Sequence, residues 1–213
     1  MAKLATLSKL KEKERETRQK LIIDAARKVF EKKTYDSVSM AEIAKTAGMA
    51  KSSIYTYFSS QESLYVEVAY RDSNYFIKEL EKKIQLSETH SVETVITHFL
   101  DYYILHKAQW RMITHFALHG DTVHESVEKL NEISRKLMDT FDSILKKLDY
   151  KGNTRLLAHT LFASLSGILI SFRNYPGRTE EERIAHMKRI GEKIKDMMIA
   201  LIEKDAGTGT SPF

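Results

Sequence analysis

The stretch SMAEIAKTAGMAKSSIYTYFSSQESL, residues 39–64, restricts the fold of this chain more than any other part of the sequence. Ser39 and Glu42 match the S-x-x-E capping box, in which each side chain binds a free amide at a helix start. The apolar residues that follow fall on one helical face: Met40, Ile43, Ala44 and Ala47. Gly48 then stands where a tight helix-to-helix turn needs a positive φ, which glycine adopts without steric cost. A short helix that ends in a glycine turn is therefore predicted.

Residues 51–58 are predicted to form a second short amphipathic helix after this turn. Ile54 and Phe58 can pack inward, because residues four apart share one face of a helix. Ser59 and Glu62 make another capping box, which opens a long helix. Two short helices joined in this way match a helix-turn-helix, which places its second helix in the DNA major groove.

The outward side chains of residues 51–58 combine a cation, hydroxyls and phenols, which suit contacts with phosphates and base edges. We predict that the DNA-facing residues are Lys51, Ser52, Ser53, Tyr55, Thr56 and Tyr57, with Ser39 and Met40 near the DNA backbone at the preceding helix. Tyr55 is expected chiefly to contact a phosphate, and Ser53 and Tyr57 are better candidates for base readout. The alternative is a polar, solvated face on a small helical hairpin.

A first helix is predicted upstream, because apolar residues there repeat at helical spacing: Leu21, Ile22, Ala25, Ala26, Val29 and Phe30. Residues 21–64 resemble the N-terminal domain of the tetracycline-repressor (TetR) family of transcription regulators. The resemblance lies in the A-x-x-x-F of Ala26 and Phe30, in Tyr35, in the Ile43-Ala44 to Ala47-Gly48 segment, and in Ile54-Tyr55-x-x-Phe58. It covers about a fifth of the chain, and the combination of motifs is highly specific.

Three positions depart from the usual pattern of the family. Thr34 stands where a glycine normally closes the first helix, so this turn needs another geometry or some strain. Ala50 replaces the usual serine before the recognition helix and lacks an N-cap that typically contributes about 1 kcal/mol. Gln61 stands where the family often has a phosphate-contacting lysine, which weakens the expectation of a charge contact there.

Positive charge is concentrated in the N-terminal part of the chain. Residues 1–60 contain 13 Lys and Arg against 7 Asp and Glu, whereas residues 61–213 contain 21 against 22. Phosphate binding requires such a local excess. The segment from Lys3 to Lys20 holds seven cations and three glutamates. It is expected to extend the first helix, to be an arm that reaches the minor groove, or to remain a solvated tail.

Composition predicts an all-α fold, because the chain has two prolines, eight glycines and no alternating β-branched runs. The absence of cysteine excludes disulfides and thiolate chemistry, and the polar first 20 residues do not resemble a secretory signal. A cytoplasmic location is therefore expected. We predict a basic N-terminal tail (residues 1–15), a three-helix helix-turn-helix headpiece (16–60), a larger C-terminal helical ligand-binding and dimerisation domain (61–206), and a disordered tail (207–213).

About nine helices are expected, which matches the layout of the family. After the headpiece, they span residues 61–85, 92–106, 109–119, a segment from the capping box of Thr122 and Glu125 to 149, a segment from Gly152-Asn153 to 174, and a segment from the capping box of Thr179 and Glu182 to 204. Residues 99–116 are rich in aromatic side chains with polar tips, which can line a ligand cavity or simply form a core. By resemblance, this region encloses the effector. The predicted ligand-binding residues are Phe99, Tyr102, Tyr103, His106, Trp110, His115, Phe116, Phe141 and Phe162.

Residues 156–172 are apolar on nearly every side, but His159, Thr160 and three serines interrupt them, so a buried helix is expected rather than a membrane span. Small residues at three- and four-residue spacing, Ala163, Ser164 and Gly167, allow another helix to approach closely. In relatives the last two helices pair with their symmetry mates, so a two-fold homodimer is expected through residues 153–174 and 179–204.

The resemblance implies a ligand-responsive, sequence-specific transcription regulator, most simply a repressor that a small apolar or aromatic effector releases from double-stranded operator DNA. A constitutive DNA-organising protein without an effector is one alternative, and a metal-dependent hydrolase is another. His115 and His119 have the i, i+4 spacing of metal ligands, with His124 or Glu125 as a third, but helix-end or surface histidines explain the pattern equally well. No nucleophile motif, phosphate loop or H-E-x-x-H occurs, so no catalytic residue, metal or cofactor is predicted.

Overall fold

The computed structural model describes residues 2–86, 92–119, 124–148 and 150–207 of the chain. Over these residues the fold is all-α, as predicted, with one short 3-10 helix. The elements are α1 (Ala2–Lys32), η1 (Tyr35–Ser37), α2 (Met40–Ala47), α3 (Lys51–Tyr55), α4 (Gln61–Leu86), α5 (Val92–Leu105), α6 (Lys107–His119), α7 (His124–Lys147), α8 (Thr154–Phe172) and α9 (Glu180–Gly207). They divide into two compact units. The first comprises Met1–Asp72 and Ala108–Leu130, and the second comprises Ser73–Lys107 and Asn131–Phe213.

The first unit is built on a core that α1, α2, α3, α4 and α6 share. Its most deeply buried side chains are Ile22, Ala26 and Phe30 of α1, Ile43 of α2, Ile54 of α3, Leu64 and Tyr65 of α4, and Met112 of α6. The apolar positions of α1 and α2 that the sequence pattern selected therefore face this core. The exceptions are Leu21, which is 54% exposed, and Ala47, which is half-buried.

The turn after α2 has the geometry expected for glycine. Gly48 has φ of 66° and ψ of 31°, and its N–H bonds the carbonyls of Ala44 and Lys45, which closes the helix. At the start of α2, Oγ of Ser39 accepts a hydrogen bond from the N–H of Glu42 (3.2 Å), so the serine half of the predicted capping box is formed. The carboxylate of Glu42 pairs instead with Nζ of Lys33 (2.7 Å).

One predicted helix start and one predicted helix end need correction. The capping residue of α4 is Ser60 and not Ser59, because Ser60 and Ser63 bond each other reciprocally: the N–H of each donates to the hydroxyl of the other, at 3.0 and 3.2 Å. The recognition helix α3 ends at Tyr55 and not at residue 58, with Thr56 as its C-cap. The predicted capping box of Thr122 and Glu125 lies outside the described residues.

The turn that carries Thr34 is free of backbone strain. Thr34 is extended, with φ of −75° and ψ of 160°, and η1 follows it directly. Its hydroxyl lies 3.0 Å from that of Ser37, which donates to the carbonyl of Thr34 (2.9 Å). A different turn geometry therefore replaces the left-handed glycine that this position normally has in the family.

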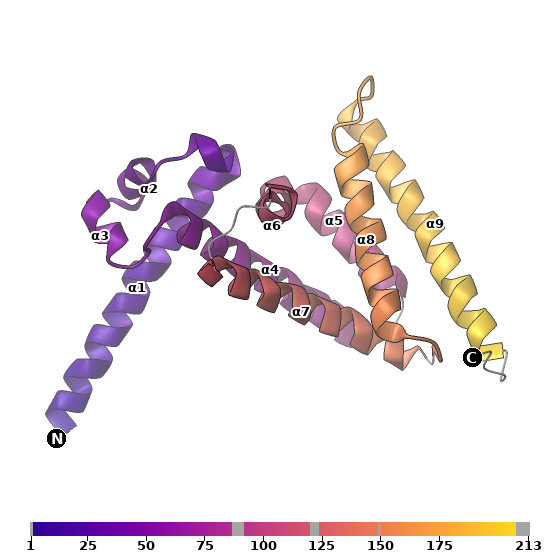
Figure 1. Cartoon of the computed structure of the whole chain (residues 1–213), viewed down its shortest axis with the longest axis horizontal. Coiled ribbons are helices and arrows are strands. Elements are labelled where there is room, and N and C mark those ends of the chain that lie inside the picture. Colours follow the sequence, from indigo (N-terminus) through magenta and orange to yellow (C-terminus); the bar gives the residue numbers. More distant parts are fainter. Residues whose placement is uncertain (1, 87–91, 120–123, 149, 208–213) are drawn as a thin grey trace. The chain divides into compact units, whose positions relative to one another are not determined.

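The second unit contains the end of α4, α5, most of α7, and the pair α8 and α9, which run antiparallel and side by side (Figure 1). Gly191 allows α9 to approach α5 closely, because a Cβ at this position would lie 2.5 Å from Cδ1 of Leu100. Helix α8 starts after Asn153 as predicted, and Oδ1 of Asn153 caps it by accepting a hydrogen bond from the N–H of Leu156 (2.9 Å). Thr179 and Glu182 form a full capping box at the start of α9, at 2.9 and 3.2 Å.

Helix α8 is the one helix, among the residues searched, that is long and apolar enough to cross a membrane by length and composition. Core helices of soluble proteins pass the same test. Only 33% of the most apolar 18-residue segment of α8 is buried within the chain. The exposed side chains on α8 include Leu156 (63%) and Ile170 (53%), together with Ala163 and Gly167. Much of the apolar surface of α8 is thus left uncovered by the rest of its own unit.

Candidate nucleic-acid interface

The recognition helix α3 is held by two anchors and presents a polar face. Ile54 is fully buried and Phe58 is 4% exposed, and both lie in the core of the first unit. The amides of Tyr57 and Phe58 bond the carbonyl of Ile54 at 2.9 and 3.0 Å, which fixes the short turn after the helix. The side chains of Lys51, Ser52, Tyr55 and Thr56 are exposed, so the structure brings these four predicted DNA contacts together on one surface.

The aromatic and cationic groups on this surface touch each other. Nζ of Lys51 lies 5.9 Å from the centre of the Tyr55 ring, a cation–π distance. Tyr55 is 46% exposed, which leaves its hydroxyl free to reach a ligand. A cation held on a phenol presents two groups that donate to phosphate oxygens.

Three other predicted DNA contacts lie deeper. Ser53 is half-buried, and Tyr57 is half-buried with its ring packed against the core of the first unit. Met40 is 5% exposed, so its side chain belongs to the core and is not available to DNA. The prediction that Met40 lies near the DNA backbone can therefore concern only its main chain, at the start of α2. Ser39 is exposed, and its hydroxyl is used as the N-cap of α2.

Two side chains that the sequence did not single out as structural supports hold the end of α1. Nη2 of Arg111, on α6, donates to the carbonyl oxygens of Phe30 (2.6 Å) and Lys33 (3.0 Å). Gln61 donates from Nε2 to the carbonyl of Tyr35 (2.9 Å). Arg111 thus satisfies carbonyls that the end of α1 leaves free. Gln61 adds a second donor to the carbonyl of Tyr35, which also accepts from the N–H of Val38 (3.3 Å). The structure thus gives Gln61 a packing role where the family often has a lysine.

An aromatic cluster lies next to the C-terminal end of α1. The ring of Tyr65 packs edge-on against Phe30 (4.6 Å between centroids) and Tyr35 (4.9 Å). His115, which was predicted to bind the effector, packs on the rings of Tyr35 (4.7 Å) and Tyr65 (5.5 Å). Burial raises the pKa of both tyrosines. His115 therefore contributes to the aromatic packing behind α1.

A buried carboxylate joins α4 to α1 in the first unit. Oδ1 of Asp72 lies 3.3 Å from Nε of Arg27, while the side chain of Asp72 is only 8% exposed. Its Oδ2 is buried and accepts no hydrogen bond from the residues described. Burial raises the pKa of Asp72 to about 6, and the guanidinium of Arg27 limits this rise. Motif matching gave no signal for this pair, because its two residues are 45 positions apart in the sequence.

Most of the predicted effector residues form a packed aromatic cluster in the second unit. Phe99, Tyr103 and Phe141 are at most 2% exposed and Tyr102 is 8% exposed. Phe76 is the centre of the cluster, with ring centroids 5.8, 5.0 and 4.9 Å from those of Phe99, Tyr102 and Tyr103. His106 packs on Tyr102 (4.3 Å) and Phe162 on Phe99 (6.1 Å). Trp110, buried, and His115 belong to the first unit. The side chain of Phe116 lies outside the described residues.

His98 belongs to this cluster and was not predicted. Its ring stacks on Phe76 at 5.2 Å with an angle of 7° between the planes, and it is 6% exposed. Burial lowers its pKa to about 4. Its Nε2 is buried and has no hydrogen-bond partner among the described residues. His98 directly precedes Phe99 in α5, and the burial of this helix over most of its length is known only from the structure.

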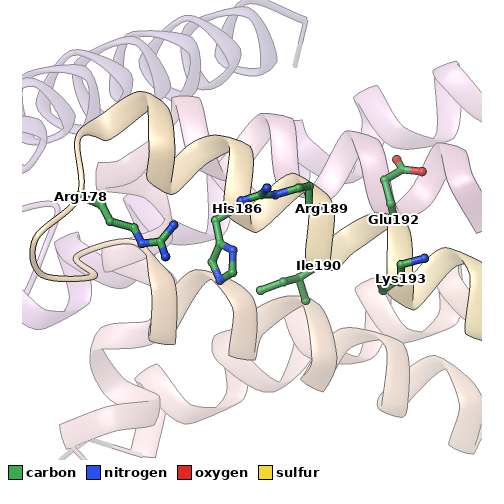
Figure 2. Close-up of a pocket in the computed structure, with 6 residues that line it drawn as sticks. All are labelled: Arg178, His186, Arg189, Ile190, Glu192 and Lys193. Carbon is green, nitrogen blue, oxygen red and sulfur yellow. The ribbon is translucent and has the colours of Figure 1, made fainter.

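A hollow of about 540 Å³ lies on the outer side of α9 and the loop before it. Its lining residues are Arg178, His186, Arg189, Ile190, Glu192 and Lys193. Figure 2 shows the side chains of Arg178 and His186 next to each other, with Ile190 one turn further along α9. A smaller cavity of about 230 Å³ lies between α5 and α9, beside Leu100 and Gly191. Neither of these two hollows is lined by the predicted effector residues.

The histidines considered as metal ligands do not form a described site. Among the described residues, no group of three His, Cys, Asp or Glu side chains could hold a metal ion. The side chains of His119, His124 and Glu125 lie outside the described residues.

Comparison with known proteins identifies the first unit. The family model described as bacterial regulatory proteins of the tetR family matches residues 22–68. The chain is 36% identical over 63 residues to an uncharacterized HTH-type transcriptional regulator of Mycobacterium tuberculosis, over 30% of this chain and 31% of that protein. It is 27% identical over 125 residues to the fatty acid metabolism regulator protein of Bacillus subtilis, over 58% of this chain and 64% of the relative. The match thus spans less than two thirds of the length of each relative.

The whole fold also has counterparts among solved structures. The crystal structure of the transcriptional regulator FadR from Bacillus subtilis, in complex with stearoyl-CoA, matches with a TM-score of 0.67 over 82% of this chain and 96% of that chain. The sequences are 22% identical, so this likeness concerns the fold alone. The headpiece motifs and the matched family model agree, and residues 22–68 form a DNA-binding domain of the TetR family of transcription regulators.

Proposed function

We propose that this protein is a sequence-specific, ligand-responsive DNA-binding repressor that acts as a homodimer in the bacterial cytoplasm. One observation carries the DNA-binding part: Lys51, Ser52, Tyr55 and Thr56 are exposed together, while Ile54 and Phe58 fix the same short segment in the core. A rigidly held polar helix can enter the major groove without the entropy loss that a mobile loop incurs.

Two recognition helices are needed to read two half-sites, and the exposed face of α8 and α9 supports dimer formation. Exposed apolar residues on this face include Leu156 and Ile170 of α8 and Met197 (71%) and Leu201 (42%) of α9. A Cβ at Gly167 would meet no heavy atom within 4 Å, which leaves room for another helix. A hollow lined by His186 and Ile190 also lies along α9 (Figure 2). A second copy of the chain is the occupant that we propose for this face.

The aromatic cluster around Phe76 has residue types suited to an apolar effector, although its rings pack against one another in this structure. It combines buried rings with phenol and imidazole groups, and such a combination binds apolar ligands and orients them through a few hydrogen bonds. The crystal structure of FadR from Bacillus subtilis holds stearoyl-CoA, a ligand with a long apolar chain. We therefore propose an apolar small molecule, with acyl thioesters as the first class to test. The effector acts only if it binds the DNA-free arrangement more tightly than the DNA-bound one.

The DNA assignment is tested with a duplex that the wild-type protein selects from random sequence. Tyr55→Ala should weaken binding to selected and unrelated duplexes to a similar degree, because a phosphate contact carries no sequence information. The double variant Lys51→Ala/Tyr55→Ala should bind the selected duplex at least tenfold more weakly at physiological salt, a loss of about 1.4 kcal/mol or more. Lys82→Ala/Tyr75→Ala, on the exposed part of α4 in the second unit, is the matched control. Unchanged affinity of the first double variant would refute the assignment.

The effector proposal needs a separate test. Native mass spectrometry of the purified protein, and titration with stearoyl-CoA, should reveal saturable binding and release from the selected duplex. Tyr103→Trp adds bulk to the cluster and should block binding while the dimer persists. A protein that binds DNA but responds to no small molecule would instead be the constitutive DNA-organising protein.

A further inference from the structure

The N-terminal half of α1 is a charged helix whose described side chains, from Leu7 to Arg18, do not pack on the rest of the first unit. Helix α1 runs from Ala2 to Lys32, but its core contacts begin only at Ile22. Every described side chain from Leu7 to Arg18 is exposed. Figure 1 shows this half of α1 extending past α2 and α3 within the first unit. At 1.5 Å per residue, the segment before Gln19 projects about 25 Å beyond the packed part of the helix.

The projecting segment is rich in unpaired cations. Between Leu7 and Lys20 it carries Lys9, Lys11, Lys13, Arg15, Arg18 and Lys20 against Glu12, Glu14 and Glu16. Within the described part of the chain, the ion pair of this segment joins Arg18 to Glu14 at 2.7 Å. No pair with Lys9, Lys11, Lys13 or Arg15 occurs there. Four exposed cations are thus available to an external anion.

The recognition helix and this segment belong to the same unit, and α2 packs directly on α1. A duplex carries one negative charge per about 1.7 Å of its axis, so a cationic helix of this length can lie beside several phosphates at once. An acidic protein would match the charge as well, but it would not need the fixed connection to α3. Duplex DNA is therefore the partner that the placement favours.

We propose that residues 7–20 of α1 form a second DNA contact, which binds phosphates of the duplex beyond the base pairs that α3 reads. This proposal rests on the proposed DNA-binding function. Of the three alternatives for this segment, the proposal keeps the extension of the first helix and not the minor-groove arm or the solvated tail. Such a helix adds phosphate contacts, and therefore affinity, without sequence specificity.

The test compares three variants that keep good helix formers in α1. The first is Lys9→Gln/Lys11→Gln/Lys13→Gln/Arg15→Gln, and the second is Glu12→Gln/Glu14→Gln/Glu16→Gln. The control removes four exposed cations of the second unit: Lys78→Gln/Lys82→Gln/Lys83→Gln/Lys147→Gln. Circular dichroism confirms that helix content is retained. Binding is measured by fluorescence anisotropy between 50 and 200 mM salt, on selected duplexes with and without flanking sequence.

The lysine and arginine variant should lose about tenfold or more in affinity for the long duplex at 100 mM salt, and its salt slope should fall by about 2 to 4, near 0.9 per phosphate contact. On the duplex without flanks it should match the wild type. The glutamate variant should bind the long duplex more tightly, because like charge has been removed. The control variant should change neither the affinity for the long duplex nor the salt slope.

An unchanged salt slope in the first variant would overturn the proposal, and so would an equal loss on the long and short duplexes. In both cases, retained preference for the selected sequence would show that the proposed function of α3 stands. Loss of that preference in the wild type would refute the proposed function itself.

Discussion

Arg111 of α6 binds the end of α1 through the carbonyl oxygen of Phe30, at 2.6 Å from Nη2. The same nitrogen lies 3.0 Å from the carbonyl oxygen of Lys33. A guanidinium at the C-terminal end of a helix satisfies free carbonyls and also interacts favourably with the helix dipole. One side chain thus ties α6 to the helix on which α2 is packed.

Replacement of Arg111 should therefore destabilise the first unit. Arg111→Gln should lower the free energy of unfolding by about 1.5–3 kcal/mol, because a charged hydrogen bond is lost at a partly buried site. Arg111→Lys should recover only part of this loss, since an ammonium cannot reproduce the planar geometry of the guanidinium. Urea denaturation followed by circular dichroism measures both values.

Arg155→Gln provides the control for this comparison. Arg155 pairs with Asp139 of α7, whose side chain is 71% exposed. Exposed pairs contribute about 0–1 kcal/mol, so this variant should stay close to the wild type. If Arg111→Gln and Arg155→Gln have equal effects, Arg111 does not hold the end of α1.

Asp72 should make the protein less stable as the pH rises. Its pKa is raised to about 6 in the folded chain, above its ordinary value of 3.8. The folded state therefore binds more protons between these values, and stability should fall by up to about 3 kcal/mol as the pH rises from 4 to 7. Asp72→Asn should remove this component of the pH profile. Urea midpoints at half-unit pH steps check it, and identical profiles for the variant and wild type would contradict it.

His98 should make the protein less stable as the pH falls, which is opposite to the effect of Asp72. Its pKa is lowered from 6.5 to about 4, because burial disfavours the charged ring. The unfolded chain binds the proton more readily, so stability should fall by about 2 kcal/mol as the pH drops from 7.5 to 5. His98→Phe keeps a flat ring against Phe76 and should abolish this loss.

The two effects partly cancel in the wild type, so they become visible only in the single variants. An NMR titration of the His98 ring provides an independent measurement, because the ring should remain neutral down to about pH 5. A ring that titrates near pH 6.5 in the folded protein would be inconsistent with this account.

Gly167→Trp should separate the subunits without unfolding them. Gly167 is exposed on α8 and its missing side chain faces open space, so the fold of the single chain can accommodate an indole. A stable interface generally buries about 1,200–2,000 Å², and a bulky ring at its centre should prevent that close approach. Light scattering should report a monomer, and affinity for the selected duplex should be lost.

Lys82→Trp, on an exposed position of α4, is the matched control and should leave the assembly unchanged. Circular dichroism of both variants shows whether the helices remain. A Gly167→Trp protein that stays an active dimer would show that the interface has been placed on the wrong helices.

Local sequence determined much of the fold of this protein. The caps at Ser39 and Thr179 and the turn at Gly48 lie where the sequence predicted them, because these residues act on the backbone within four positions of themselves. The all-α class and the buried stripes of α1 and α2 followed from residue spacing in the same way. The cap of α4 moved from Ser59 to Ser60, because the sequence offers three adjacent or near-adjacent serines and only the fold selects between them.

The tertiary structure decided what each aromatic and charged side chain does. Met40 was predicted near the DNA backbone and His115 in the effector site, but the fold placed the side chain of Met40 in a core and His115 on two tyrosine rings. Arg111 and Asp72 gained their roles from partners 81 and 45 positions away, which no local pattern encodes. Burial and long-range pairing depend on the environment of a residue in three dimensions, and for that reason the sequence alone could not assign them.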